Sequence, residues 1–200
     1  PGYPHPDNFR GQADLLFRND NDAGFTNVSQ LSGIADEGGK GLGVAFADYD
    51  DDGWPDIYVA NDAVRNFLYQ NNRDGTFSEQ GVVVGVAYGQ DGQMEAGMGV
   101  DWGDYDGDGK SDIFWRNSDT GKNFIYLMDG ASIKERYALN YVTAGVWELA
   151  GSGDFNGDGR DDLALNGPQG WGTVPTAFSA ADSQALTSKY YFKIGNRWQP

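Results

Sequence analysis

Cysteine is missing from this chain of 200 residues, and histidine occurs once, at His5. Without cysteine there are neither disulfide bonds nor thiolate metal sites. A nucleophilic catalytic triad usually needs a histidine as its base, and His5 lies in a proline-rich segment that makes it a poor candidate. No glycine-rich phosphate loop precedes a helix pattern either. We therefore expect a protein that is not an enzyme.

Basic residues are also scarce: 14 Lys and Arg stand against 30 Asp and Glu, a net charge of −16. Proteins that bind nucleic acids need Lys and Arg to neutralise phosphates, so we expect no nucleic-acid partner. Long hydrophobic runs are absent as well, and none approaches the roughly 20 residues of a membrane-spanning helix. The sequence therefore predicts no membrane span.

Glycine and aromatic residues are abundant. The chain has 30 glycines, and aromatic residues make up 14% of it, which fits an all-β, turn-rich protein better than a helical one. Its length is ample for one domain with a substantial core.

The most informative segment is 104–112, with the sequence Asp-Tyr-Asp-Gly-Asp-Gly-Lys-Ser-Asp. It has carboxylates at positions 1, 3, 5 and 9, and a glycine at position 6. Calcium takes six to eight oxygen ligands, and aspartates at alternate positions can surround one ion if the backbone curls around it. Gly109 permits this curl because glycine reaches positive φ at little cost. The pattern predicts a calcium-binding loop.

The same pattern occurs at 48–56 and at 154–162, where Asn156 replaces one carboxylate but still offers an oxygen. Asp- and Gly-rich hairpin turns without metal are the alternative, but three loops with matched oxygen positions favour calcium, with about three ions in all. At position 7 the expected ligand is the backbone carbonyl. The predicted metal-binding residues are Asp48, Asp50, Asp52, Trp54 and Asp56; Asp104, Asp106, Asp108, Lys110 and Asp112; and Asp154, Asn156, Asp158, Arg160 and Asp162.

These loops differ from EF-hands, which need a glutamate at position 12. Here position 12 is Val59, Trp115 or Leu165, and β-branched and apolar residues flank each loop. The flanking pattern predicts strands, so each loop is expected to close a β-hairpin.

The loops begin 56 and then 50 residues apart, at Asp48, Asp104 and Asp154. Further strand patterns separated by Asp/Gly turns lie between them, so each repeat is predicted to hold four antiparallel strands. Repeats of this length and content are typical of β-propeller blades. We expect an extended proline-rich arm at 1–13 and one propeller-type domain at 14–200, a partial or small propeller of about three to four blades. The predicted blades are 14–40 (partial), 41–96, 97–146 and 147–200. Residues 14–29 are expected to form a hairpin with a polar turn, and 172–179 and 189–198 to supply the outer strands of the last blade.

The segment from Gly43 to Asp62, with its Asp-Tyr-Asp-Asp-Asp-Gly-Trp-Pro-Asp core, resembles the FG-GAP/VCBS repeat of integrin α-chain propellers and many bacterial surface proteins. Residues from about Leu15 to Phe114 are similar to bacterial proteins of the ASPIC/UnbV group, and Asn117–Asn166 to tandem VCBS repeats of secreted bacterial proteins. The resemblance implies calcium at the matched aspartates and a secreted or cell-surface protein, of bacterial origin.

We expect a calcium-stiffened extracellular structural or adhesion module that acts through protein–protein contact. Seven blades, common in such propellers, would need roughly 350 residues at about 50 per blade. An incomplete set leaves a sheet edge open to another chain, so self-association into an oligomer or filament is expected. The alternative is a lectin-like module that presents a tryptophan to sugars. Trp54 is the best candidate for an exposed tryptophan, whereas Trp102 and Trp115 are expected to pack between blades.

Overall fold

The computed structural model describes residues 8–36, 38–89, 91–94, 97–117, 120–139, 148–166, 176–177 and 179. In this part the protein is all-β, and every strand pair is antiparallel. The predicted fold class is therefore confirmed.

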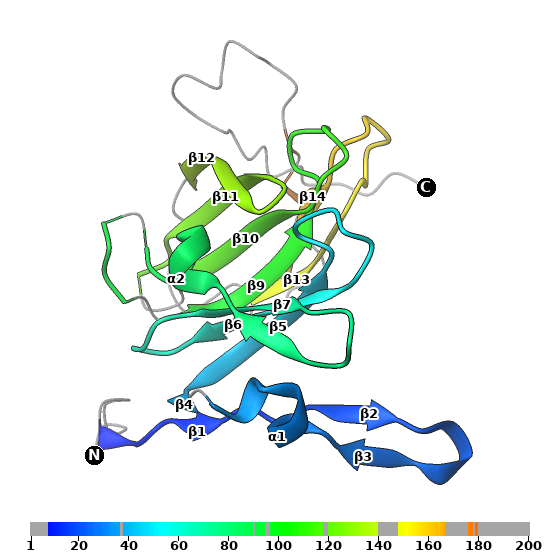
Figure 1. The fold of residues 1–200 in the computed structure, drawn as a ribbon. Helices are drawn as coiled ribbons and strands as arrows, with labels where there is room; N and C mark the ends of the chain where they lie inside the picture. Colours follow the sequence, from blue (N-terminus) through cyan, green and yellow to red (C-terminus); the bar gives the residue numbers. More distant parts are fainter. Residues whose placement is uncertain are drawn as a thin grey trace.

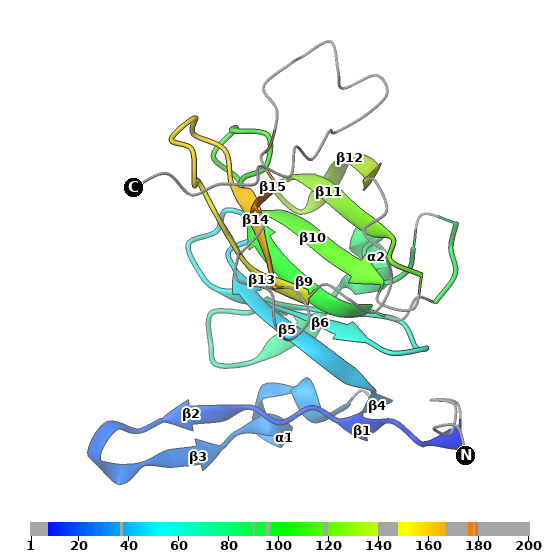
Figure 2. The ribbon, with the colours of Figure 1, turned by 180° about the vertical axis from the view of Figure 1, so that it is seen from behind.

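Three sheets follow one another along the chain and lie side by side (Figures 1 and 2). The first two are four-stranded and have the predicted order of strand, carboxylate loop, strand, link, strand, turn and strand. Sheet I consists of β5 (Gly41–Ala47), β6 (Asp56–Asn61), β7 (Phe67–Asn71) and β8 (Phe77–Glu79). Sheet II consists of β9 (Gly97–Gly103), β10 (Asp112–Asn117), β11 (Asn123–Asp129) and β12 (Ser132–Leu139). Sheet III consists of β13 (Glu148–Gly153), β14 (Asp162–Asn166) and β15 (Thr176–Ala177).

The N-terminal part forms two small sheets that extend away from the three larger ones (Figures 1 and 2). β2 (Phe17–Asn19) and β3 (Phe25–Asn27) make the hairpin that the sequence predicts. β1 (Gln12–Ala13) pairs with β4 (Gly38–Gly39), so the last two residues of the expected arm are in a strand. Residues 1–7 of that arm lie outside the described residues.

Short helices complete the described elements. The two α-helices are α1 (Ser29–Ser32) and α2 (Gly81–Val84), and Asn21–Ala23 and Ile34–Asp36 are 3-10 turns. Among the described residues, no helix has the length and apolar character needed to cross a membrane.

Aromatic and aliphatic side chains fill the spaces between the sheets. Tyr58 of sheet I, Trp102 of sheet II and their neighbours form one buried cluster between these two sheets. A second cluster joins Phe114 of sheet II to Leu163 of sheet III. Every residue of β6 and β10 is buried, because each of these strands lies inside its sheet and has both faces covered. These clusters hold the sheets in a stack.

Burial separates the tryptophans into two groups. Trp102 and Trp115 are 8% and 1% exposed, and Trp115 stacks on Phe124 with ring centroids 4.3 Å apart. Trp54 is 47% exposed. Trp147, Trp171 and Trp198 lie outside the described residues.

Candidate metal centre

The three carboxylate-rich loops, here loop 1 (residues 48–56), loop 2 (104–112) and loop 3 (154–162), each join the first two strands of a sheet. Strand pairing continues up to the loop in every case: Ala47 pairs with Asp56, Gly103 with Asp112, and Gly153 with Asp162. The loop residues are therefore held between the ends of two paired strands. This confirms that the loops close β-hairpins.

The aspartate at position 1 holds the loop backbone in its curl. In loop 2, Asp104 Oδ1 accepts hydrogen bonds from the backbone N–H of Gly107 (2.7 Å) and Asp108 (3.0 Å), and its Oδ2 accepts one from Gly109 (2.8 Å). Asp154 makes the same three contacts in loop 3, and Asp48 accepts from Asp52 and Gly53 in loop 1. Carboxylates are strong acceptors for backbone N–H groups, so this residue stabilises the loop conformation through contacts within the protein alone.

Two positions in every loop have left-handed backbone conformations. Position 6 is glycine throughout, with φ of 88°, 85° and 85°. Position 4 is also left-handed, with φ of 63° at Asp51, 76° at Gly107 and 79° at Gly157. The turn at position 6 was predicted from its glycine, whereas the one at position 4 was not. Glycine at position 4 of loops 2 and 3 could have indicated this turn, but loop 1 has Asp51 at that position.

The aspartate at position 9 links its loop to the third strand of the same sheet or, in loop 3, to Ser179 just after that strand. Asp112, which is completely buried, accepts hydrogen bonds from the N–H of Tyr105 (2.9 Å) and from that of Met128 in β11 (2.8 Å). Asp56 accepts equivalent bonds from Tyr49 and Asn71, and Asp162 from Phe155 and Ser179. This residue is thus a structural clamp as well as a predicted ligand.

Burial changes the ionisation of these clamp residues. It raises the pKa of Asp56 to about 6 and that of Asp112 to about 7, although their backbone N–H donors act in the opposite direction. The pKa of Asp162 is also raised by burial. A nearby cation favours the ionised carboxylate, so metal binding in the loops would offset the cost of burying these charges.

Carboxylates converge in two of the loops. Oxygens of Asp48, Asp50 and Asp56 in loop 1, and of Asp104, Asp106 and Asp108 in loop 2, lie within 4.8 Å of one another in each group. One calcium ion with ligands at about 2.4 Å can bridge oxygens that are about 4.8 Å apart. Among the described residues, loop 3 has no such group of acidic side chains.

A buried oxygen in loop 1 supports the fit to a cation. Asp50 Oδ1 is buried and has no hydrogen-bond partner, while Asp50 Oδ2 accepts a hydrogen bond of 2.5 Å from Gln70 Nε2. A buried acceptor without a partner is costly, and a cation would satisfy it. The donor set consists of hard oxygens, which suits calcium. Asp48, Asp50 and Asp56 are therefore the residues that would hold an ion in loop 1.

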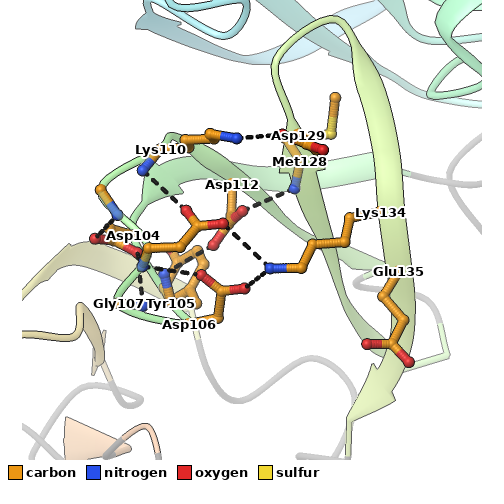
Figure 3. A network of polar contacts seen from close by, with 12 residues as sticks. Asp104, Tyr105, Asp106, Gly107, Lys110, Asp112, Met128, Asp129, Lys134 and Glu135 are labelled. Atoms are coloured by element: carbon orange, nitrogen blue, oxygen red, sulfur yellow. Dashed lines mark hydrogen bonds and ion pairs between the residues drawn. The ribbon is translucent and has the colours of Figure 1, made fainter.

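Two basic side chains from elsewhere in the chain contact the loops. In loop 2, Lys134 Nζ of β12 lies 2.8 Å from Asp106 Oδ2 (Figure 3) and 3.2 Å from Asp108 Oδ2. Lys110 also forms an ion pair with Asp129 (Figure 3). In loop 1, Arg73 of the β7–β8 turn lies 2.8 Å from Asp52 Oδ2 and lowers the pKa of Asp52. The contacts of Lys134 and Arg73 with the loops were not predicted, because these two residues stand outside the repeating motif.

The residues at position 7, whose backbone carbonyls are predicted ligands, also form hydrogen bonds within their own loops through their N–H groups. Trp54, Lys110 and Arg160 each donate a backbone hydrogen bond to the position-5 carboxylate, at 2.8, 3.0 and 3.0 Å. In loop 3, Asn156 Oδ1 accepts from the N–H of Asp158, and Asn156 Nδ2 donates to Asp158 Oδ2. The metal-ligating roles of these four residues remain predictions.

Loops 2 and 3 also contact each other. The N–H of Asp104 donates to Asp161 Oδ2 (2.9 Å), and the N–H of Asp161 donates to the carbonyl of Asp104 (2.7 Å). An ordered loop 2 therefore supports loop 3.

Stacked antiparallel sheets whose first hairpin ends in a nine-residue carboxylate loop define a repeat protein of the propeller-blade class. The sequence model of the FG-GAP-like repeat matches residues 8–59, 48–115 and 104–165. The chain belongs to this family, and the predicted resemblance is confirmed.

A similar protein is cartilage acidic protein 1 of Xenopus tropicalis. It is 33% identical to this chain over 112 residues. The alignment covers 54% of this chain but only 16% of that protein, so the chain corresponds to a small part of this relative.

Proposed function

We propose that this protein is a calcium-binding extracellular module without enzymatic activity, which acts through protein–protein contact. The observation that carries the proposal is the convergence of three carboxylates in loop 1 and in loop 2, together with the buried, unpaired Asp50 Oδ1. FG-GAP-like repeats are typical of extracellular interaction modules and are typically non-enzymatic. The similar protein of Xenopus tropicalis is named for cartilage.

Calcium would act here by stiffening the hairpins. Each loop holds several aspartates, which repel one another when no cation is bound. A ligand that binds only the folded state stabilises it, by about 2.7 kcal/mol per site at 100 times Kd. With about three ions, one in each loop, this contribution is large beside the usual net stability of a domain.

The test is thermal unfolding with calcium and with EGTA. We expect a higher melting temperature in calcium, and magnesium to be a poor substitute because it demands tighter octahedral geometry. Asp106→Ala, which removes a loop 2 ligand, should reduce the calcium-induced increase in Tm. Asp22→Ala removes an exposed aspartate of the β2–β3 turn and serves as the matched control. Equal melting temperatures in calcium and EGTA for the unmodified protein would refute the metal assignment.

Carbohydrate binding is the second candidate function, and the exposure of Trp54 in loop 1 favours it. A tryptophan beside a calcium loop offers a flat apolar face with a polar edge, which suits a sugar ring. Glycan-array binding that is lost in Trp54→Ala and kept in Phe25→Ala, an exposed aromatic of the β2–β3 hairpin, would support a lectin. No binding by the unmodified protein would exclude this candidate for the glycans on the array.

A further inference from the structure

Half of one face of sheet I is exposed and apolar. β5 places Leu42, Val44 and Phe46 on the face that points away from sheet II, and they are 50%, 56% and 60% exposed. On the same face, the neighbouring strands β6 and β7 are covered, because Leu16 and Ile34 of the N-terminal part pack on them. The N-terminal part thus covers β6 and β7 on this face and leaves β5 exposed.

The corresponding positions of the next two sheets are covered. The residue two positions before each loop is Phe46 in sheet I, Trp102 in sheet II and Ser152 in sheet III. Trp102 is only 8% exposed and contacts Tyr49 and Tyr58 of sheet I, with ring centroids 6.5 and 6.1 Å apart. Ser152 Oγ donates a hydrogen bond of 2.8 Å to the carbonyl of Trp102. In both cases the first strand of a sheet contacts the sheet that precedes it.

The other side of each contact is formed by the aromatic residue at position 2 of the loop in the preceding sheet. Tyr49 and Tyr105 are 2% and 0% exposed, because sheet II and sheet III pack against them. Phe155, at the same position in loop 3, is 46% exposed. In the described residues, Phe46 therefore lacks a preceding sheet to pack on, and Phe155 lacks a following sheet.

The surface around Phe46 is concave. A cavity of about 370 Å³ lies between the N-terminal part and β5, and its lining includes Asp14, Leu16, Val44, Phe46 and Tyr69. Asp14 Oδ2 is buried and has no hydrogen-bond partner. β5 is also the edge strand of sheet I. An incoming hairpin would fill the apolar space and could supply an N–H donor to Asp14.

We propose that sheet III of a second copy of the chain packs on the exposed face of β5, with Phe155 of that copy in the cavity and packed on Phe46, as Tyr49 packs on Trp102 within one chain. This inference rests on the proposed function, in which the module acts through protein–protein contact. A contact that pairs Phe46 with Phe46 would leave Phe155 exposed, whereas a contact that pairs Phe46 of one copy with Phe155 of the other covers both residues. Head-to-tail contacts form rings when they close and filaments when they do not.

Two aspartate variants of the full chain test the geometry in calcium, by sedimentation velocity at micromolar concentration. Phe46→Asp disables one half of the contact and Phe155→Asp the other, so each should weaken self-association at least about tenfold. An equimolar mixture of the two variants retains one intact pair, Phe155 of the first and Phe46 of the second. We expect the mixture to form dimers and nothing larger. Val83→Asp, at an exposed valine of α2, should associate like the unmodified protein.

Three results would overturn the proposal: a monomeric unmodified protein, variants that associate as it does, or a mixture that remains monomeric. A monomer would indicate that another segment or partner covers Phe46. Calcium-induced melting shifts, measured on the same samples, separate this failure from failure of the metal assignment and also show that the variants fold. Val44→Asp replaces Phe46→Asp if the latter does not fold.

Discussion

Gly109 shows how much of loop 2 depends on backbone conformation alone. Its φ is 85°, and a Cβ built at this position would meet no other atom within 4 Å. A substitution there tests the conformation without a steric clash.

We predict that Gly109→Ala lowers the free energy of unfolding by about 1–2 kcal/mol, the usual cost of a left-handed residue with a Cβ. Urea unfolding in EGTA measures this without a contribution from calcium. Gly38→Ala is the matched control, because its Cβ also meets nothing within 4 Å and its φ lies outside the left-handed range. Equal unfolding free energies for the two variants would contradict the prediction.

At the scale of single residues, the sequence predicts what its motif repeats. Alternating oxygens with glycine at position 6 identify the loops, and the structure places them at the ends of hairpins. The double role of Asp112 could not be predicted, because the N–H of Met128 that it binds lies 16 residues away. A periodic motif gives the spacing of ligands but not the partners that lie in another strand.

Lys134 connects an edge strand to the adjacent loop. It comes from β12 and contacts two carboxylates of loop 2 (Figure 3). Exposed ion pairs of this kind contribute about 0.2–1 kcal/mol. A calcium ion held by Asp106 and Asp108 has to displace the ammonium group or share these oxygens with it.

We predict that Lys134→Gln increases the calcium affinity of loop 2 by about 1.4- to fivefold, the range that this ion-pair energy allows. Isothermal titration calorimetry measures the change. Lys122→Gln removes the same charge outside the loops and should leave the affinity unchanged. A weaker affinity in Lys134→Gln would indicate that the lysine helps to position the carboxylates rather than competing with the ion.

Among the secondary-structure elements, the strands next to the loops were predicted correctly, because apolar and β-branched residues bracket a recognisable turn. The helices α1 and α2 were not, since four residues are too few to show a helical period. The pairing of β1 with β4 was also missed. Gly38–Gly39 has no preference for a strand, and only tertiary contact makes it one.

For the whole molecule, the four-stranded repeat was predicted and is observed in sheets I and II. Sheet III has three strands in the described residues, and β15 falls within the segment 172–179 that was expected to supply an outer strand. The segment 189–198, expected to supply another, lies outside the described residues. The division into blades and the number of bound ions remain predictions. The side of sheet I left exposed could not be predicted, because it depends on which half of the sheet Leu16 and Ile34 cover.

The clamp at Asp112 has a consequence for chain continuity. Its side chain holds the N–H of Tyr105, before the tip of loop 2, and that of Met128, well after it. The two strands are also paired from Gly103 and Asp112 onward. These hydrogen bonds and the strand pairing thus hold the two sides of loop 2 together, independently of the peptide bonds at its exposed tip near Gly107. A protein divided there into two polypeptides could reassemble from its halves, and calcium, whose predicted ligands come from both sides of the cut, would act as the cofactor of that reassembly.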